Sequence, residues 1–162
     1  MSLPDPSTGY SNDEERPLAG YAGLVGLFNA IGLASIVALR RDSGTLPERI
    51  PLGDLALLST ATFKLSRLLG KDKVTSFLRA PFTEFQEGAG HGEVEEQPRG
   101  RGLRLAVGEL LVCPYCLDQW VATGFVLGFL ASPKATRLAA GALSIVALAD
   151  ALQIAYKAAE NG

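Results

Sequence analysis

An uncharged apolar segment of 22 residues, Leu18–Leu39, restricts the fold of this chain more than any other feature. As an α-helix with a rise of about 1.5 Å per residue it would be about 33 Å long. The hydrocarbon core of a bilayer is about 30 Å thick, and an uncharged segment of this length is typical of a membrane span. Two arginines, Arg40 and Arg41, follow directly. The sequence therefore predicts a membrane-spanning helix here.

Two more apolar segments lie in the second half of the chain. Leu138–Tyr156 contains one charge, Asp150. Leu110–Ala131 is interrupted near its start by Pro114, Asp118 and Gln119. A short polar turn at 132–137 separates the two segments, so we expect an antiparallel pair of helices.

The segment Pro51–Leu69 allows two interpretations. One helical face is apolar, and another carries Lys64 and Arg67. Such a helix lies in the headgroup layer, or it crosses the membrane with its bases paired to acids. The predicted fold class is therefore all-α: a helical multi-pass membrane protein with three or four membrane helices, one of which is a candidate interfacial helix.

The remaining segments are polar. We expect a flexible tail at 1–17, a single helical domain at 18–157 and a short tail at 158–162. Within the domain, residues 83–104 are rich in Gly and Glu and predict a mobile loop. A net charge of −2 argues against a nucleic-acid partner.

The distribution of Lys and Arg predicts the orientation, because these residues favour the cytoplasmic side of short loops. With three spans, twelve of the 15 basic residues are cytoplasmic. With four spans, eight are cytoplasmic, five are outside, and Lys64 and Arg67 are buried. Both arrangements place residues 70–108 in the cytoplasm and the protein in the cell membrane.

Small residues recur every four positions along the first apolar segment, at Ala22, Gly26, Ala30 and Ala34. This spacing lets two helices approach closely in lipid. We expect a packing face, either within the chain or between copies of it.

Cys113-Pro114-Tyr115-Cys116 contains the two cysteines of the chain. A cysteine at a helix N-cap, with proline at the first helical position, has its thiolate stabilised by backbone N–H groups. Glu109 is a candidate proton acceptor one turn away. The sequence contains no credible strand, which excludes a thioredoxin-like fold and leaves only the local dithiol chemistry.

Two other interpretations of the cysteines remain open. Two thiolates are half of a zinc site, and His91 is the single histidine that could join them, so zinc is a weak candidate and no other cofactor is predicted. Alternatively, both cysteines simply pack between helices in a reducing cytosol.

Charged residues within apolar helices usually find partners. We expect Lys64 and Arg67 to pair with Asp118 and Asp150, with Arg67 the better candidate for a bidentate pair.

Three stretches together resemble a known family: Ala61–Leu68, Leu78–Phe82, and Gly108–Leu117 followed by Trp120. Their order and spacing are similar to those of small bacterial membrane proteins with a domain of unknown function, which include a sporulation membrane protein. The resemblance covers about residues 52–131. It implies an integral membrane protein and supplies no activity.

The sequence favours a non-enzymatic role, because it has no phosphate loop, catalytic triad or complete metal set. We expect a membrane anchor or interaction component with a cytoplasmic, cysteine-bearing face. Its predicted partners are the lipid bilayer and either further copies of itself or a larger assembly. The alternative is a membrane redox or metal-binding protein that uses Cys113 and Cys116.

Overall fold

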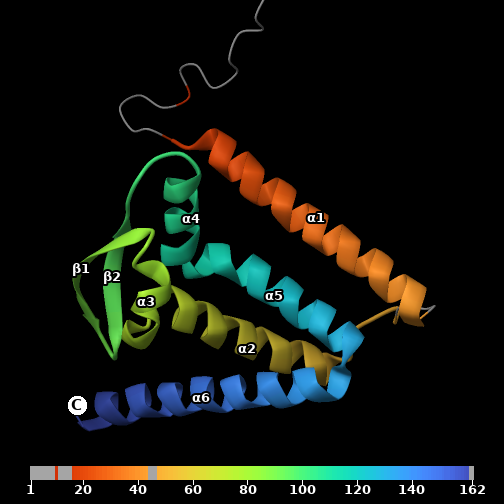
Figure 1. Cartoon of the computed structure of the whole chain (residues 1–162). Helices are drawn as coiled ribbons and strands as arrows, with labels where there is room; N and C mark the ends of the chain where they lie inside the picture. The colour runs from red at the N-terminus through yellow and green to blue at the C-terminus, as the bar shows by residue number, and fades with distance from the viewer. Residues whose placement is uncertain (1–9, 11–15, 44–46, 161–162) are drawn as a thin grey trace, which may run out of the picture.

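Four long helices lie roughly along one direction, and a small β-hairpin lies at one end of them (Figure 1). The computed structural model describes residue 10 and residues 16–43 and 47–160. The long helices are α1 (Leu18–Ser43), α2 (Leu52–Gly70), α5 (Pro114–Ala131) and α6 (Pro133–Glu160). Successive long helices run in opposite directions, so the start of α1 and the end of α6 both lie toward the hairpin end. Most residues of the two predicted tails, 1–17 and 158–162, lie outside the described residues. Residues 158–160 are described and belong to α6.

Two of the described helices are long and apolar enough to cross a membrane. They are Leu18–Arg41 of α1 and the whole of α6, whose most apolar 18-residue windows have mean hydropathies of 2.1 and 1.8. Little of either helix is buried within the chain. Their apolar side chains are therefore available to an apolar environment outside the protein.

The third predicted span is not one helix. Leu110–Val112 belongs to α4 (Leu103–Val112), and α5 leaves α4 at an angle of 87°. Proline lacks a backbone N–H and forces the preceding residue out of the helical region. Accordingly, Cys113 is extended, with φ −107° and ψ 99°. If this bent pair is one broken span, the structure has three candidate spans.

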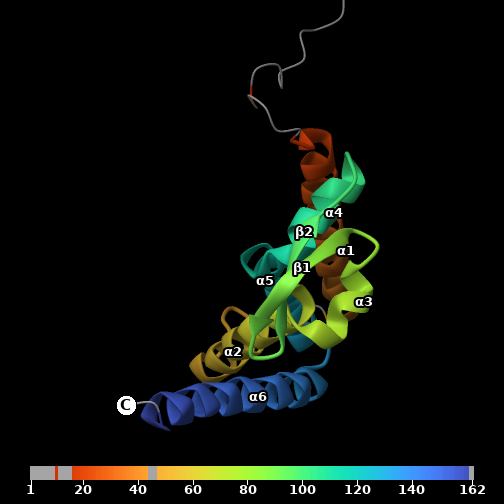
Figure 2. The same ribbon diagram turned by 90° about the vertical axis from the view of Figure 1, so that its left-hand side faces the viewer.

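The expectation of an all-α fold without strands is wrong for a β-hairpin, which lies within the segment 83–104 that the sequence predicted as a loop. Strands β1 (Thr83–Gly90) and β2 (Glu93–Pro98) pair in antiparallel register. The turn between them has positive φ at Gly90, His91 and Gly92, which suits glycine at two of the three positions. Figure 2 shows the hairpin in front of the ends of the helices.

Backbone hydrogen bonds attach the hairpin to the end of α2. The N–H of Lys73 donates to the carbonyl of Gly92, and the N–H of Val94 donates to the carbonyl of Lys71. Val94 is 3% exposed and is the apolar anchor of β2. Between α2 and β1 lie the short helices η1 (Lys73–Thr75) and α3 (Ser76–Arg79). We call residues 73–98 the polar head.

The core lies where α2, α5 and α6 meet. Leu58, Ala61, Phe129 and Ala140 form a buried cluster there. Ala61 and Ala140 are fully buried, and their small side chains let the helices approach closely. Helix α2 is therefore the central helix, packed against both α5 and α6.

Glycines allow close contact at two other crossings. A Cβ on Gly108 of α4 would lie 2.6 Å from the carbonyl oxygen of Phe82, at the base of the hairpin. A Cβ on Gly20 of α1 would lie 2.8 Å from the Cβ of Ala106 in α4. Helix α4 thus links the polar head to α1.

Candidate functional site

The guanidinium of Arg79 is the centre of the polar head. Its side chain is fully buried, and its Nε donates to Oε2 of Glu96, a side chain 5% exposed, over 2.6 Å. The other donors reach four more oxygens: the carbonyls of Leu69 and Asp72 and the hydroxyls of Thr75 and Ser76. The five N–H groups of an arginine thus each have a partner. Arg79 therefore joins the end of α2, the short helices and β2.

Two further carboxylates of β2 pair with bases at the end of α2. Glu93 accepts two hydrogen bonds from Arg67, at 2.9 and 2.5 Å. Glu95 lies 2.7 Å from Nζ of Lys71. Together with Glu96, these acids fix the hairpin on the helices through charge as well as through backbone contacts.

Ion pairs also tie α2 to α6 at two places. Asp54 accepts two hydrogen bonds of 2.7 Å from Arg137, near the start of both helices. Farther along, Nζ of Lys64 lies 2.5 Å from Oδ2 of Asp150. Helix α2 consequently runs alongside α6 over much of its length.

The structure brings together only part of the predicted ion-pair set. Lys64 and Asp150 are in contact, whereas Arg67 pairs with Glu93 instead of an acid in the apolar helices. Among the described residues no ion pair includes Asp118. The predicted partner of Arg67 was wrong because the hairpin, which the sequence did not reveal, brings a carboxylate to the end of α2.

Cys113 and Cys116 lie at the corner between α4 and α5. Cys113 is the N-cap of α5, Pro114 occupies the first helical turn, and the Sγ of Cys113 accepts a hydrogen bond of 3.3 Å from the N–H of Cys116. Both thiols are free, and Cys116 is exposed. This is the helix-start geometry in which backbone N–H groups stabilise a thiolate.

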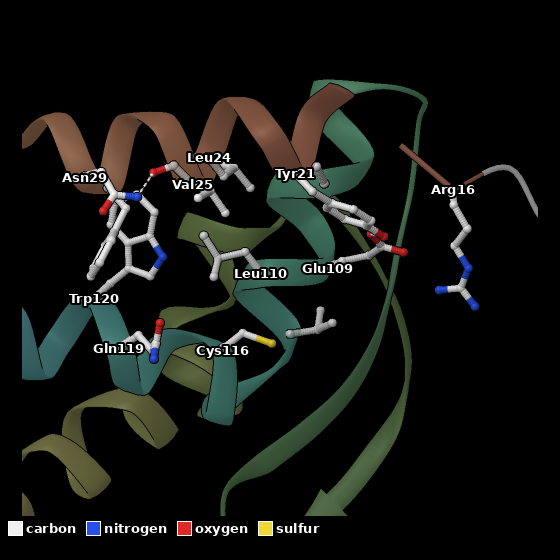
Figure 3. A pocket seen from close by; sticks show the side chains of 13 residues that line it. Arg16, Tyr21, Leu24, Val25, Asn29, Glu109, Leu110, Cys116, Gln119 and Trp120 are labelled. Atoms are coloured by element: carbon white, nitrogen blue, oxygen red, sulfur yellow. Dashed lines mark hydrogen bonds between the residues drawn. The ribbon is translucent and has the colours of Figure 1, made fainter. Parts of the chain in front are cut away.

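A cavity of about 740 Å³ opens beside Cys116, between α1, α4 and α5 (Figure 3). Leu24, Val25 and Leu110 line its middle, and the rings of Phe28 and Trp120 meet edge to face with centroids 5.1 Å apart. Polar side chains lie at its two ends. They are Arg16, Tyr21 and Glu109 at one end and Asn29 and Gln119 at the other.

Glu109 faces α1 across this cavity. The hydroxyl of Tyr21 donates a short hydrogen bond to Oε2 of Glu109. The sequence suggested Glu109 as a group near Cys113, but nothing in it pointed to Tyr21, which is 88 residues away. The contact depends on the crossing of α1 over α4.

The remaining predicted site residues do not join the cysteines. The histidine lies elsewhere in the fold, and the small residues of α1 are not packed against another described helix. His91 is in the exposed turn of the hairpin. Among the described residues no group of three or more His, Cys, Asp or Glu side chains is placed to hold a metal ion. Ala22, Gly26, Ala30 and Ala34 are exposed along α1, so they make no packing face within the described chain.

The fold and these contacts define a mostly helical protein with two helices that could cross a membrane and a polar head fixed by ion pairs. The chain belongs to a family described as a protein of unknown function (DUF1360), whose model matches residues 57–156. This confirms the family resemblance expected from the sequence. Helix α1 lies outside the matched segment.

Two curated relatives from Bacillus subtilis (strain 168) are similar to the chain. Sporulation protein YjcA is 34% identical over 102 residues, which cover 61% of this chain and 86% of that protein. UPF0713 protein YngL is 29% identical over 110 residues, which cover 66% of this chain and 78% of that protein. No solved structure matches the chain significantly.

Replacing Arg79 by methionine should lower the free energy of unfolding by about 3–5 kcal/mol, because Glu96 would remain buried without its partner. Arg79→Lys should restore only part of the loss, since one ammonium cannot reach all five acceptors. The measurement is chemical unfolding of the purified protein, together with the rate of proteolysis within 83–98.

Lys71→Met is the matched control. It removes the more exposed pair with Glu95 and should cost at most about 1 kcal/mol. Equal stability of Arg79→Met and the unmodified protein would contradict the structural role of the buried pair.

Proposed function

We propose that this protein is a multi-pass component of the cell membrane that holds its polar head at the cytoplasmic surface for a protein partner. One observation carries the proposal: a hairpin with an exposed outer strand is fixed by the fully buried Arg79 to helices whose apolar sides are uncovered. The sporulation name of one relative supports a place in an assembly used in sporulation.

The ion pairs between α2 and α6 support four membrane crossings rather than three. A helix in the headgroup layer would lie across α6, but Asp54–Arg137 and Lys64–Asp150 hold α2 along it. Residues 137 and 150 are about 20 Å apart on a helix. If α6 crosses the bilayer, α2 crosses with it, and its charges are paired inside the bundle.

The proposed orientation rests on how the basic residues divide between the two sides of the membrane. With four crossings, the head, the start of α1 and the end of α6 lie on one side, with eight of the 15 basic residues, and the turn between α5 and α6 lies on the other. The excess of Lys and Arg favours the cytoplasm for the head.

The outer strand supports a role in protein interaction. Seven of the eight residues of β1 are exposed, and β1 pairs only with β2 in this sheet. An unpaired strand edge offers backbone N–H and C=O groups to an extended segment of a partner. Because Arg79 already fixes the hairpin, the strand would lose little conformational entropy when a partner binds to it.

Cysteine labelling would test the four-crossing arrangement. In a Cys113→Ser, Cys116→Ser background, Glu48→Cys should react with a membrane-impermeant maleimide in intact cells. His91→Cys, in the hairpin turn, should react only after permeabilisation. Protection of Glu48→Cys in intact cells would favour three crossings, and labelling of His91→Cys there would overturn the cytoplasmic head.

Photo-crosslinking would test the interaction role. A photoreactive residue at Gln86 in β1 should give an adduct with a second polypeptide in the native host. The same residue at Thr60, on the exposed side of α2, should give none because it faces lipid. Arg79→Met should weaken the Gln86 adduct, since the hairpin loses its anchor. Absence of a polypeptide adduct at both Gln86 and Glu87 would contradict the interaction role.

Thiol–disulfide exchange at Cys113 and Cys116 is a second candidate function. The observation that favours it is the N-cap position of Cys113, whose sulfur accepts the N–H of Cys116. Two thiols within one helical turn can form an intrachain disulfide and open again.

The dithiol function predicts a reversible disulfide. Treatment of the purified protein with diamide should remove both thiols from alkylation, and dithiothreitol should restore them. Mass-tag alkylation counts the thiols, and Cys113→Ser serves as the control that cannot close the bridge within one chain. Two thiols that stay alkylatable after diamide would exclude this function.

A further inference from the structure

We propose that the cavity between α1, α4 and α5 binds a lipid-soluble quinone, which the Cys113–Cys116 dithiol reduces. The inference rests on the second candidate function, and it names the substrate class of that dithiol. It comes from the position of Cys116, one of the two thiols, on the wall of a largely apolar cavity between helices.

The cavity suits an apolar ring. Its volume of about 740 Å³ falls within the range of about 300–1,000 Å³ that is usual for small-molecule sites. Phe28 and Trp120, set at 70° to each other, present aromatic surface from α1 and α5. A flat ring gains stacking and edge contacts against such a pair.

The polar ends of the cavity suit two carbonyl oxygens on opposite sides of a ring. At one end the hydroxyl of Tyr21 is hydrogen-bonded to Glu109, and at the other lie the amides of Asn29 and Gln119 (Figure 3). Gln119 and the second amide N–H of Asn29 can donate to one quinone oxygen, and the hydroxyl of Tyr21 would donate to the other by turning away from Glu109. The Tyr21–Glu109 pair also offers a proton path to that oxygen when it gains electrons.

The sulfurs supply the electrons. Cys116 lines the cavity, and Cys113 lies one helical turn before it, with its sulfur 3.3 Å from the Cys116 nitrogen. In the reaction the two S–H bonds break and one S–S bond forms. The two electrons and two protons released pass to the two quinone oxygens, which yields a hydroquinone. Cytosolic thiols would then reopen the disulfide by exchange.

Access to the cavity depends on α1. This helix supplies Leu24, Val25 and Phe28 to one wall, while the outward side chains of its second half are exposed. It crosses α4 closely at Gly20 and Ala106. A lipid-soluble molecule could therefore enter from the bilayer beside α1 without passing through water.

The test uses the full chain, purified, reduced and placed in lipid nanodiscs without oxygen. A short-tailed ubiquinone analogue is added, quinone absorbance is followed, and free thiols are counted by mass-tag alkylation. We expect one quinone reduced for each disulfide formed and no disulfide-linked reduction in Cys113→Ser or Cys116→Ser.

A pair of tryptophan substitutions separates the cavity from the dithiol. Leu24→Trp fills the cavity and should slow quinone reduction by about tenfold or more, because overpacking excludes the ring. Leu33→Trp lies on the same helix at an exposed position outside the cavity and should leave the rate unchanged. Diamide should oxidise both variants as fast as the unmodified protein.

Each outcome decides between the two ideas. Oxidation by diamide without reduction of quinone would overturn the quinone site and leave the dithiol function standing. Failure of both oxidants would overturn both. Equal quinone rates in Leu24→Trp and Leu33→Trp would place the reaction outside the cavity. If Leu24→Trp does not fold, Val25→Trp narrows the same cavity from a position that is 60% exposed; it should slow quinone reduction while diamide still oxidises both thiols.

Discussion

The buried guanidinium of Arg79 is the interaction on which the polar head depends. A charge removed from water is costly unless each of its donors is satisfied and an opposite charge is close. Arg79 meets both conditions, with Glu96 from β2 and four other oxygens from residues 69–76. The hairpin buries little apolar surface apart from Val94, so this network replaces the core that such a small sheet lacks.

The same principle organises the helices. Helix α2 lies at the centre, and its charged residues are neutralised by residues from α6 and β2 rather than by water. A helix with three charges in its 19 residues fits among apolar neighbours because each charge has a partner. Helices α5 and α6 pack against α2, and its C-terminal end holds the hairpin through backbone hydrogen bonds.

Much of the helical framework was predictable. Leu18–Leu39 and Leu138–Tyr156 lie within α1 and α6, and Pro51–Leu69 corresponds to α2. Proline restricts its own backbone and that of the preceding residue, so the N-cap position of Cys113 could also be predicted from the sequence. The hairpin was missed because its strands are polar and are stabilised by bases from α2 and α3. The cavity was missed because nothing in the sequence indicates that Tyr21 and Trp120 line the same cavity as Glu109.

The sequence by itself determined which segments are helical and apolar, and it placed a dithiol at a helix start. These properties depend on side-chain hydrophobicity and on backbone chemistry within a few residues. Only the tertiary structure decided that Arg67 pairs with Glu93, that Arg79 is buried against Glu96, and that Cys116 opens into a cavity closed by α1. The two ion pairs join residues 26 and 17 positions apart, and Tyr21 and Glu109 beside the cavity are 88 positions apart. Sequence does not reveal such contacts, because a charge pairs with whichever partner the packing brings within reach.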